Sequence, residues 1–248
     1  MNILVVNDDG IEAPGIRLLA QTMQGFGQVK VVAPHTQQSA IGHGITIHDP
    51  IRLRERPDYL PDVQAWSIDA KPADCVKFAL YALHLSVDLV VSGINDGPNL
   101  GTDIMYSGTL GGASEGIICG IPSISFSTDF SGWDLPSLEL RGVVQQILEK
   151  KLIHPDHVLN VNFPKKEFAR SKGIRVTEMG DRPFLHQFDE ADEPGLYWAR
   201  GTWDQGENHE GTDVWAYENG FISLSPIQIN RTNYGVLKEL RRKIQQDF

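Results

Sequence analysis

The feature of the sequence that most limits its fold is a regular alternation between two hydrophobic patterns. Short runs rich in Val and Ile alternate with longer segments whose apolar residues recur at helical spacing. The expected strands are 2–7, 28–34, 66–70, 87–95, 122–127 and 157–163. The expected helices are 14–23, 72–83, 109–119 and 138–151. Such alternation predicts parallel strands joined by crossover helices, which is a doubly wound, mostly parallel α/β sheet.

The C-terminal third of the chain carries different signals. An acidic stretch covers residues 189–193, and charge, glycine and aromatic residues are more frequent than before it. The run 214–224 places Asn219-Gly220 between alternating apolar residues, which predicts a β-hairpin. A polar and basic helix is expected from Tyr234 to about Gln246.

These signals predict one domain, residues 1–248, with a core at about 1–165 and a C-terminal extension at about 170–248. A hairpin that projects from a core has to bury its apolar face against another surface. The extension is therefore expected to reach a neighbouring subunit.

Composition limits the class of protein and its partners. The 248 residues are 41% hydrophobic and 22% charged, as in soluble globular proteins, and the formal net charge is −10. This negative charge argues against a nucleic acid polymer as partner. No apolar run approaches the roughly 18 residues of a membrane span, and the N-terminal run, 3–6, is too short for a signal peptide. Cys75 and Cys119 are expected to be buried thiols in a reducing cytoplasm.

Oxygen-bearing side chains follow three of the expected strands. Asp8 and Asp9 come after the first strand, Ser39 after the second, and Asn95 at the end of the strand 87–95. Ligands of open α/β sheets bind beyond the carboxyl ends of the strands. Carboxylate, hydroxyl and amide oxygens suit a hard divalent cation such as Mg²⁺, Mn²⁺ or Ca²⁺. Alone, Asp8-Asp9-Gly10 is equally a turn or a helix cap, and Ser39 a solvated serine.

Adjacent strand residues point to opposite faces, so Asp8 and Asp9 can share one ion only if the backbone bends between them. Gly10, which follows them, favours such a bend.

A second pattern, YSGTLGGASEG, indicates an anion site. A loop ends at Ser107-Gly108-Thr109, and a helix of small residues follows, with Thr109 as the expected N-cap. A helix N-terminus with close backbone amides favours phosphate, although capping and close packing alone explain the same residues. The sequence contains neither a Walker loop nor G-x-G-x-x-G after the first strand, so dinucleotide binding is not supported.

Metal oxygens next to an anion-binding helix end suggest hydrolysis of a phosphate ester by a metal-activated water. A covalent aspartyl-phosphate of the haloacid-dehalogenase type needs D-x-D. Here Asn7 lies two residues before Asp9, and Gly10 two after Asp8. The sequence also lacks the G-x-S-x-G elbow of a serine hydrolase.

Five segments together resemble the SurE family of survival-protein nucleotidases. They are NILVVNDDGIEAPGI, VVAPHTQQSA, KPADCVKFAL, VDLVVSGINDGPNLGTDIMYSGTLGGASEG and GTDVWAYENGFISLSP. The resemblance implies a Rossmann-like core and a metal-dependent 5′-nucleotidase, with 3′-nucleotides and short polyphosphate as further substrates of some members. It also implies a homodimer or homotetramer whose subunits exchange parts of the C-terminal extension.

Residue by residue, the resemblance assigns one divalent cation per subunit, Mg²⁺ or Mn²⁺, to Asp8, Asp9, Ser39 and Asn95. Asp8 and Asp9 are also the expected catalytic residues. The phosphate region falls on Asn99, Ser107, Gly108 and Thr109.

The chain departs from the family pattern at two places. HTQQ precedes Ser39 where many members carry a charged D-R-x-x stretch, with Ala40 where Gly is frequent, and Lys71 replaces a small hydroxyl residue. The first change is expected to alter substrate fit near the metal, and the second to alter base or sugar selection. Two alternatives stay open: a polyphosphatase or general phosphomonoesterase with the same site, and a regulatory protein that binds nucleotides without hydrolysis.

Overall fold

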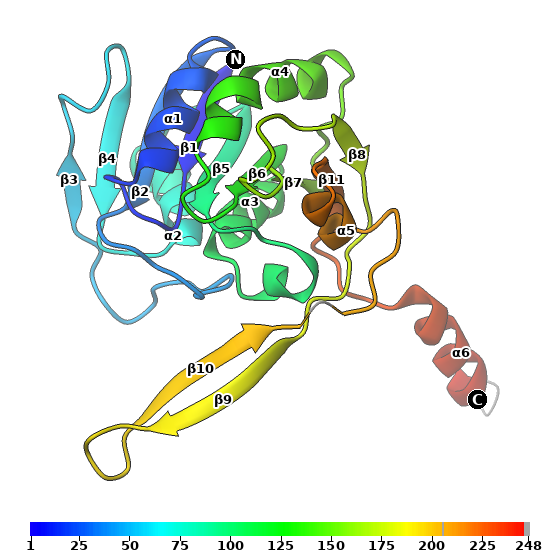
Figure 1. Cartoon of the computed structure of the whole chain (residues 1–248). Coiled ribbons are helices and arrows are strands. Elements are labelled where there is room, and N and C mark those ends of the chain that lie inside the picture. Colours follow the sequence, from blue (N-terminus) through cyan, green and yellow to red (C-terminus); the bar gives the residue numbers. More distant parts are fainter. Residues whose placement is uncertain (205, 246–248) are drawn as a thin grey trace.

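The computed structural model describes residues 1–204 and 206–245, and it has a large central sheet with helices on both faces (Figure 1). Within these residues the main sheet has nine strands in the order β3-β4-β2-β1-β5-β6-β7-β11-β8. They are β1 (Asn2–Val6), β2 (Gln28–Pro34), β3 (Leu53–Glu55), β4 (Gln64–Ile68), β5 (Leu89–Asp96), β6 (Ser123–Thr128), β7 (His157–Asn162), β8 (Ile174–Val176) and β11 (Ile222–Gln228).

Helices lie between many of these strands, and the last helix follows the last strand. They are α1 (Pro14–Met23), α2 (Pro72–Lys77), continued by the π-helical η1 (Phe78–Ala82), the 3₁₀ turn η2 (Gly101–Met105), α3 (Gly108–Ile118), α4 (Asp134–Glu149), α5 (Asp213–Glu218) and α6 (Tyr234–Gln245). The predicted mostly parallel α/β sheet is confirmed: all pairings from β4 to β7 are parallel, and β3 and β11 each add an antiparallel one.

Strand β1 shows why the sheet needs helices on both faces. Its alternate residues Ile3 and Val5 belong to one core, which also contains residues of α1 and α4. Leu4 and Val6 belong to a second core on the other face, with residues of α2. All four side chains are at most 1% exposed, as expected for a continuous apolar strand of a parallel sheet.

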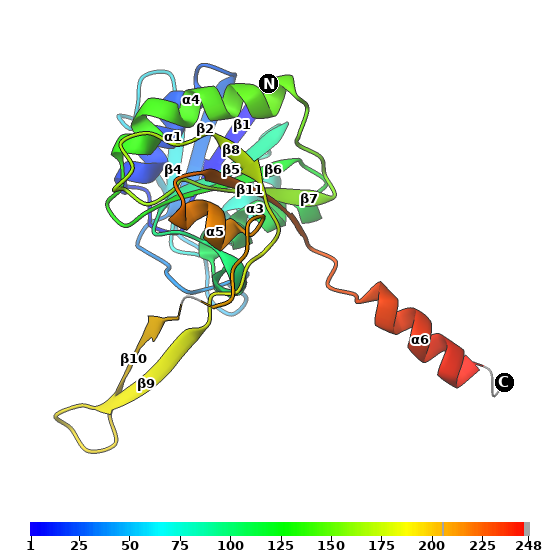
Figure 2. The ribbon, with the colours of Figure 1, turned by 45° about the vertical axis from the view of Figure 1, so that its right-hand side comes forward.

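The C-terminal part contains two projecting elements, the hairpin β9 (Phe184–Glu190) with β10 (Tyr197–Trp203), and the helix α6. Figures 1 and 2 show both extending away from the core, the hairpin and the helix in different directions. The C-terminal extension thus contains a hairpin and a helix as predicted, but the hairpin lies at 184–203, with the acidic residues 189–193 near its tip. Gln246, the expected end of the helix, lies outside the described residues.

The prediction of a hairpin at Asn219-Gly220 is wrong. Residues before this pair form α5, whose N-cap Thr212 accepts a hydrogen bond from the Trp215 amide. Asn219 is the C-cap, and Gly220 has a φ of +85°, so the pair ends a helix. Asn-Gly provides the left-handed backbone for both structures, and a local pattern does not separate them.

Candidate functional site

The bend that follows β1 brings the two adjacent carboxylates to one cavity. β1 ends at Val6, and Gly10 has a φ of +96°, a conformation that favours glycine. The buried Asn7 side chain holds the turn closed, because its amide nitrogen donates to the Gly10 carbonyl at 2.8 Å. The bend expected at Asp8-Asp9 is therefore present, and both side chains line the same cavity.

This cavity has a volume of about 460 Å³, and six of the eight residues predicted for the site line it. They are Asp8, Asp9, Ser39, Asn95, Asn99 and Ser107. They come from the carboxyl ends of β1, β2 and β5 and from the start of α3, because β1 pairs with both β2 and β5. The other two residues, Gly108 and Thr109, lie behind Asp8 and do not line the cavity.

Asp8 is the most buried of the carboxylates that line this cavity, and the residue is only 5% exposed. The Thr109 hydroxyl donates to Asp8 Oδ1 at 2.5 Å. Burial, and then the charge of Asp9, raise the pKa of Asp8 to about 7. The raised pKa reflects the cost of burying this carboxylate next to a second one.

Asp9 is fixed by two neighbours on the cavity wall. The Asp96 amide donates to Asp9 Oδ2 at 3.0 Å, which connects the ends of β1 and β5. The Gln37 side chain donates to Asp9 Oδ1 at 3.2 Å. Burial also raises the pKa of Asp9, since these hydrogen bonds only partly offset it.

The remaining two predicted ligands are held by backbone contacts. The backbone N–H of Gln38 donates to the backbone carbonyl of Asp8 at 2.7 Å, which brings the loop containing Ser39 against the end of β1. The Asn95 side chain donates through its nitrogen to the Gly97 carbonyl at 2.7 Å. That bond leaves the amide oxygen, the atom that binds cations, on the other side of the group.

The chemistry of these donors fits a hard cation. Two carboxylates, a hydroxyl and an amide border one cavity, and burial raises the pKa of both carboxylates. Across residues 1–204 and 206–245, none of the ion pairs involves Asp8 or Asp9, so no basic side chain neutralises them. A divalent cation would supply the missing positive charge.

The start of α3 has a different cap from the predicted one. Ser107, not Thr109, is the N-cap, because its hydroxyl oxygen accepts from the Leu110 amide at 3.1 Å. Thr109 is fully buried in the first turn. Gly108 packs directly on Asp8, since a Cβ placed on it would lie 2.8 Å from both Asp8 Cβ and Oδ2.

Asn99 is held in a buried network of asparagines. Its backbone N–H donates to Asn162 Oδ1 at 2.8 Å, and its side-chain nitrogen donates to the Ser127 hydroxyl at 2.8 Å. Asn160 and Asn162 both donate to the Asn99 carbonyl at 3.0 Å. This network fixes the loop after β5 at the cavity edge.

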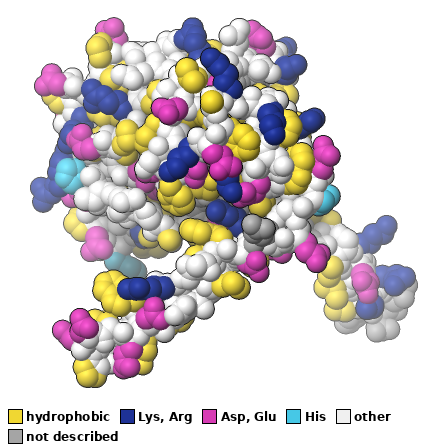
Figure 3. All heavy atoms as spheres, in the orientation of Figure 1, with side chains coloured by type: hydrophobic (Ala, Val, Ile, Leu, Met, Phe, Trp, Pro, Cys, Tyr) yellow, Lys and Arg dark blue, Asp and Glu magenta, His cyan; other side chains and the backbone are white. Residues whose placement is uncertain are grey.

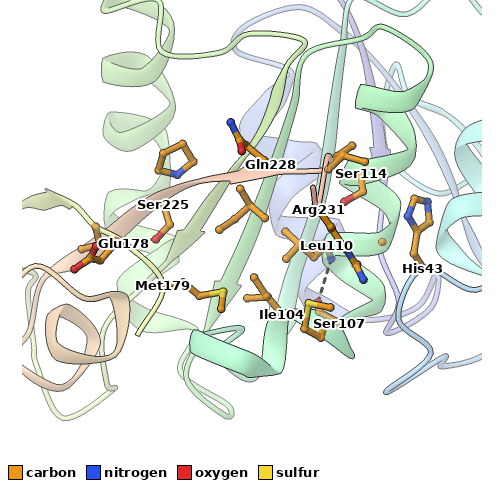
Figure 4. A pocket seen from close by; sticks show the side chains of 16 residues that line it. His43, Ile104, Ser107, Leu110, Ser114, Glu178, Met179, Ser225, Gln228 and Arg231 are labelled. Atoms are coloured by element: carbon orange, nitrogen blue, oxygen red, sulfur yellow. Dashed lines mark hydrogen bonds between the residues drawn. The ribbon is translucent and has the colours of Figure 1, made fainter. Parts of the chain in front are cut away.

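A larger cavity, of about 620 Å³, lies at the other side of the start of α3, and Figure 4 shows its lining. Ser107 and His43 reach it together with Glu178, Ser225 and Arg231, but Asp8, Asp9, Ser39 and Asn95 do not. Its lining contains no pair of adjacent carboxylates, so size alone is a poor guide here. The smaller cavity is the one that contains the four predicted ligands.

Several residues that contact or line the site were not among the predicted site residues. Gln37 belongs to the HTQQ segment, and Asp96 directly follows the predicted ligand Asn95, so their closeness in sequence to predicted ligands indicated them. The aromatic lining had no such signal, because it joins distant parts of the chain: Tyr106, Phe130, Phe184, His186 and Trp203.

The two departures from the family pattern lie in different places. Gln37, within HTQQ, contacts Asp9 and therefore reaches the site. Lys71 lines a separate cavity of about 470 Å³, and its Nζ donates to the Ile45 carbonyl at 2.8 Å. No contact connects Lys71 with the predicted ligands among the described residues.

The fold and this carboxylate cavity define an α/β protein with a polar site at the carboxyl ends of its parallel strands. The family model "Survival protein SurE" matches residues 3–185, and the chain belongs to the SurE family. The 5′-nucleotidase SurE of Heliobacterium modesticaldum is 41% identical, over 97% of this chain and 90% of that protein. That of Carboxydothermus hydrogenoformans is 43% identical, over 97% of this chain and 95% of its own length.

The fold is also shared with a solved structure. The crystal structure of the SurE protein from Aquifex aeolicus superposes with a TM-score of 0.80 at 39% sequence identity. The match covers 98% of this chain and 99% of that one. Within the described part of the chain, no helix has the length and apolar character needed to span a membrane.

Proposed function

We propose that this protein is a metal-dependent 5′-nucleotidase that hydrolyses nucleoside monophosphates to nucleoside and phosphate. The single observation that carries the proposal is the pair of carboxylates, buried Asp8 and half-buried Asp9, on one cavity beside the N-terminus of α3. The relatives named 5′-nucleotidase SurE, at about 40% identity over nearly the whole chain, support the substrate class.

Asp8, Asp9, Ser39 and Asn95 would hold one divalent cation, Mg²⁺ or Mn²⁺. When bound, such a cation supplies positive charge to the phosphoryl oxygens and increases the acidity of water. The ligand oxygens are those that both ions prefer, and none of the four proposed ligands is a thiol or an imidazole, which would favour a softer metal.

The chain's own residues provide the rest of the reaction. One of the two aspartates, both of which line the cavity, takes a proton from the attacking water. As the water oxygen bonds to phosphorus, the bond from phosphorus to the ribose oxygen breaks, and the nucleoside leaves when that oxygen takes up the proton removed from the water. Ser107, the N-cap of α3, lines the cavity and would contact the phosphoryl group, whose negative charge the N-terminus of the helix stabilises.

A substrate panel tests this proposal against its rivals. Phosphate release is measured from AMP, GMP, 3′-AMP, polyphosphate and p-nitrophenyl phosphate. The proposal expects the highest kcat/KM with a 5′-mononucleotide, with 3′-AMP and short polyphosphate as weaker substrates. A clear preference for polyphosphate or p-nitrophenyl phosphate contradicts it, and binding of AMP without phosphate release identifies a regulatory protein.

The projecting elements support a homodimer or homotetramer. Large apolar side chains are exposed on the hairpin and on one side of α6, as Figure 3 shows along both projections. They are Leu185, Phe188, Leu196, Tyr197, Trp198, Tyr234, Val236, Leu240 and Ile244. A second copy of the chain would cover them, and light scattering of the full chain tests the assembly.

A cytoplasmic location belongs to the same proposal. Both cysteines are free thiols, with Cys75 buried and Cys119 half-buried. Free thiols persist in a reducing compartment, and cell fractionation tests the location.

A further inference from the structure

The cavity that contains the carboxylates is also lined by aromatic side chains. Three large rings line it and are nevertheless about half exposed: Tyr106 (61%), Phe130 (49%) and Trp203 (45%). They come from three separate segments, namely the end of η2, the loop between β6 and α4, and the last residue of β10. Half-exposed aromatic side chains that converge on one cavity indicate a binding surface for a flat, apolar group.

Trp203 is the best anchored of the three rings. Its indole nitrogen donates to Asp103 Oδ1 at 3.2 Å, and the Arg182 guanidinium donates to Asp103 Oδ2 at 2.6 Å. The guanidinium carbon also lies 4.7 Å from the centre of the Trp203 ring. Asp103 thus holds Arg182 and Trp203 together, which fixes the orientation of the indole.

Neighbouring rings continue this surface along the base of the hairpin. Phe184, the first residue of β9, contacts Trp203 edge-on with ring centres 5.2 Å apart. Phe130 lies 6.4 Å from Trp203, centre to centre. Thr102 of η2 donates to the Arg182 carbonyl at 3.0 Å, which ties the start of the hairpin to the core.

We infer that Trp203, held by Asp103 and Arg182, is the main contact of this protein for the nucleobase of its substrate. The inference rests on the proposed nucleotidase activity, because it assigns the phosphate to the carboxylates of the cavity. The base then packs on the aromatic lining, with Tyr106 and Phe130 beside it. The end of the hairpin β9–β10 that is next to the core therefore contributes to substrate selection, whatever the tip of the hairpin contacts.

The contact predicts which substrates depend on Trp203. Stacking of a base on an aromatic side chain contributes enough to change an affinity by about tenfold. Ribose 5-phosphate carries the same phosphate on the same sugar carbon but has no base. Loss of the indole should therefore weaken the binding of AMP and leave the KM for ribose 5-phosphate unchanged.

The experiment compares Trp203→Ala, Trp203→Phe and the control Tyr81→Ala in the full chain. Tyr81 is an exposed aromatic residue of η1, and it lies outside the cavity, the hairpin and α6. KM and kcat are measured for AMP and for ribose 5-phosphate, together with the Kd of AMP in the presence of Mn²⁺. We expect about a tenfold rise of KM and Kd for AMP in Trp203→Ala, with kcat nearly unchanged. Trp203→Phe should restore most of the loss, and Tyr81→Ala should behave as wild type.

Asp103 is tested as a positioning residue through a double-mutant cycle. Asp103→Ala should raise KM for AMP, but it should add little when combined with Trp203→Ala, because both act through the same ring. Equal effects on AMP and ribose 5-phosphate, or wild-type KM for AMP in Trp203→Ala, would overturn the inference. If the wild type binds AMP but hydrolyses neither compound, the proposed function fails, while the Kd values still decide the role of Trp203.

Discussion

The hydroxyl of Thr109, at the start of α3, donates a hydrogen bond to Asp8 Oδ1, at the end of β1. The two residues were predicted for different parts of the site, Asp8 for the metal and Thr109 for the phosphate. The structure instead places Thr109 behind Asp8, fully buried and away from the cavity. Thr109 therefore affects the site indirectly, because its hydrogen bond orients the Asp8 carboxylate.

Replacing Thr109 by Val should therefore lower kcat by about ten- to a hundredfold, since a small displacement of a catalytic group has effects of this size. Val keeps the shape of Thr and removes only the hydroxyl. Circular dichroism should show an unchanged fold. Thr109→Ser, which keeps the hydroxyl, serves as the matched control and should retain most activity. Wild-type kcat in Thr109→Val would show that this hydrogen bond does not position Asp8.

Gly108 should not tolerate a side chain. A Cβ there would lie 2.8 Å from Asp8 Oδ2, so Gly108→Ala has to displace the carboxylate. We expect a loss of activity of at least tenfold and weaker binding of Mn²⁺, measured by calorimetry. Gly142→Ala is the control, because that position in α4 is open within 4 Å. It should leave activity unchanged and stabilise the protein by up to about 1 kcal/mol.

Asp213 should be important for stability and not for chemistry. It is buried, and its carboxylate accepts three backbone amides, from Gly101 at 3.0 Å, Gly180 at 2.7 Å and Val214 at 2.8 Å. Asp213→Ala would leave these donors without their acceptor, which should cost about 3 kcal/mol in the free energy of unfolding. Urea denaturation measures this loss. A change below about 1 kcal/mol would mean that water replaces the carboxylate.

Asp129 should make stability depend on pH in the acid range. Burial alone would raise the pKa of its carboxyl, but hydrogen bonds from the Lys166 and Phe130 amides and the Tyr217 hydroxyl outweigh it and lower the pKa. Because the folded state binds this proton less readily, the stabilisation is present above the ordinary value of 3.8. It is lost as the pH falls through the lower, folded pKa.

The Tyr217 hydroxyl donates to Asp129 Oδ1 at 2.8 Å, which gives this prediction a matched variant. Tyr217→Phe should lower the free energy of unfolding by about 1.5–3 kcal/mol at pH 7, as expected for a bond to a charged acceptor. The difference from wild type should shrink below pH 3.8, where the carboxyl is increasingly protonated. If Tyr217→Phe lowered the free energy of unfolding equally at pH 7 and below pH 3.8, the assignment of charge to Asp129 would be contradicted.

Much of the core was predictable because its strands and helices are locally consistent. α1 and β2 have the expected bounds, 14–23 and 28–34, since each has a clean apolar period and clear ends. The helix expected at 72–83 is divided between α2 and η1, as a change of helical type leaves the apolar pattern intact. Asn219-Gly220 was misassigned because the dipeptide suits both a helix end and a hairpin turn.

The candidate site divides in the same way. Asp8, Asp9, Ser39 and Asn95 could be found because each follows a recognisable strand, and sheet topology brings strand ends together. Trp203 could not be found in this way. It reaches the cavity through a hairpin that begins about twenty residues after β7, and no local period reports where a projecting hairpin points.

Phosphate release from AMP before and after removal of divalent cations tests the central claim most directly. The account predicts that EDTA abolishes release and that Mg²⁺ or Mn²⁺ restores it in the wild type. Asp8→Asn, which keeps the size of the side chain, should remain folded but lose most of the rate and much of the affinity for the cation. Full activity in EDTA, or wild-type activity of Asp8→Asn with either cation, would contradict a metal-dependent site at the end of β1.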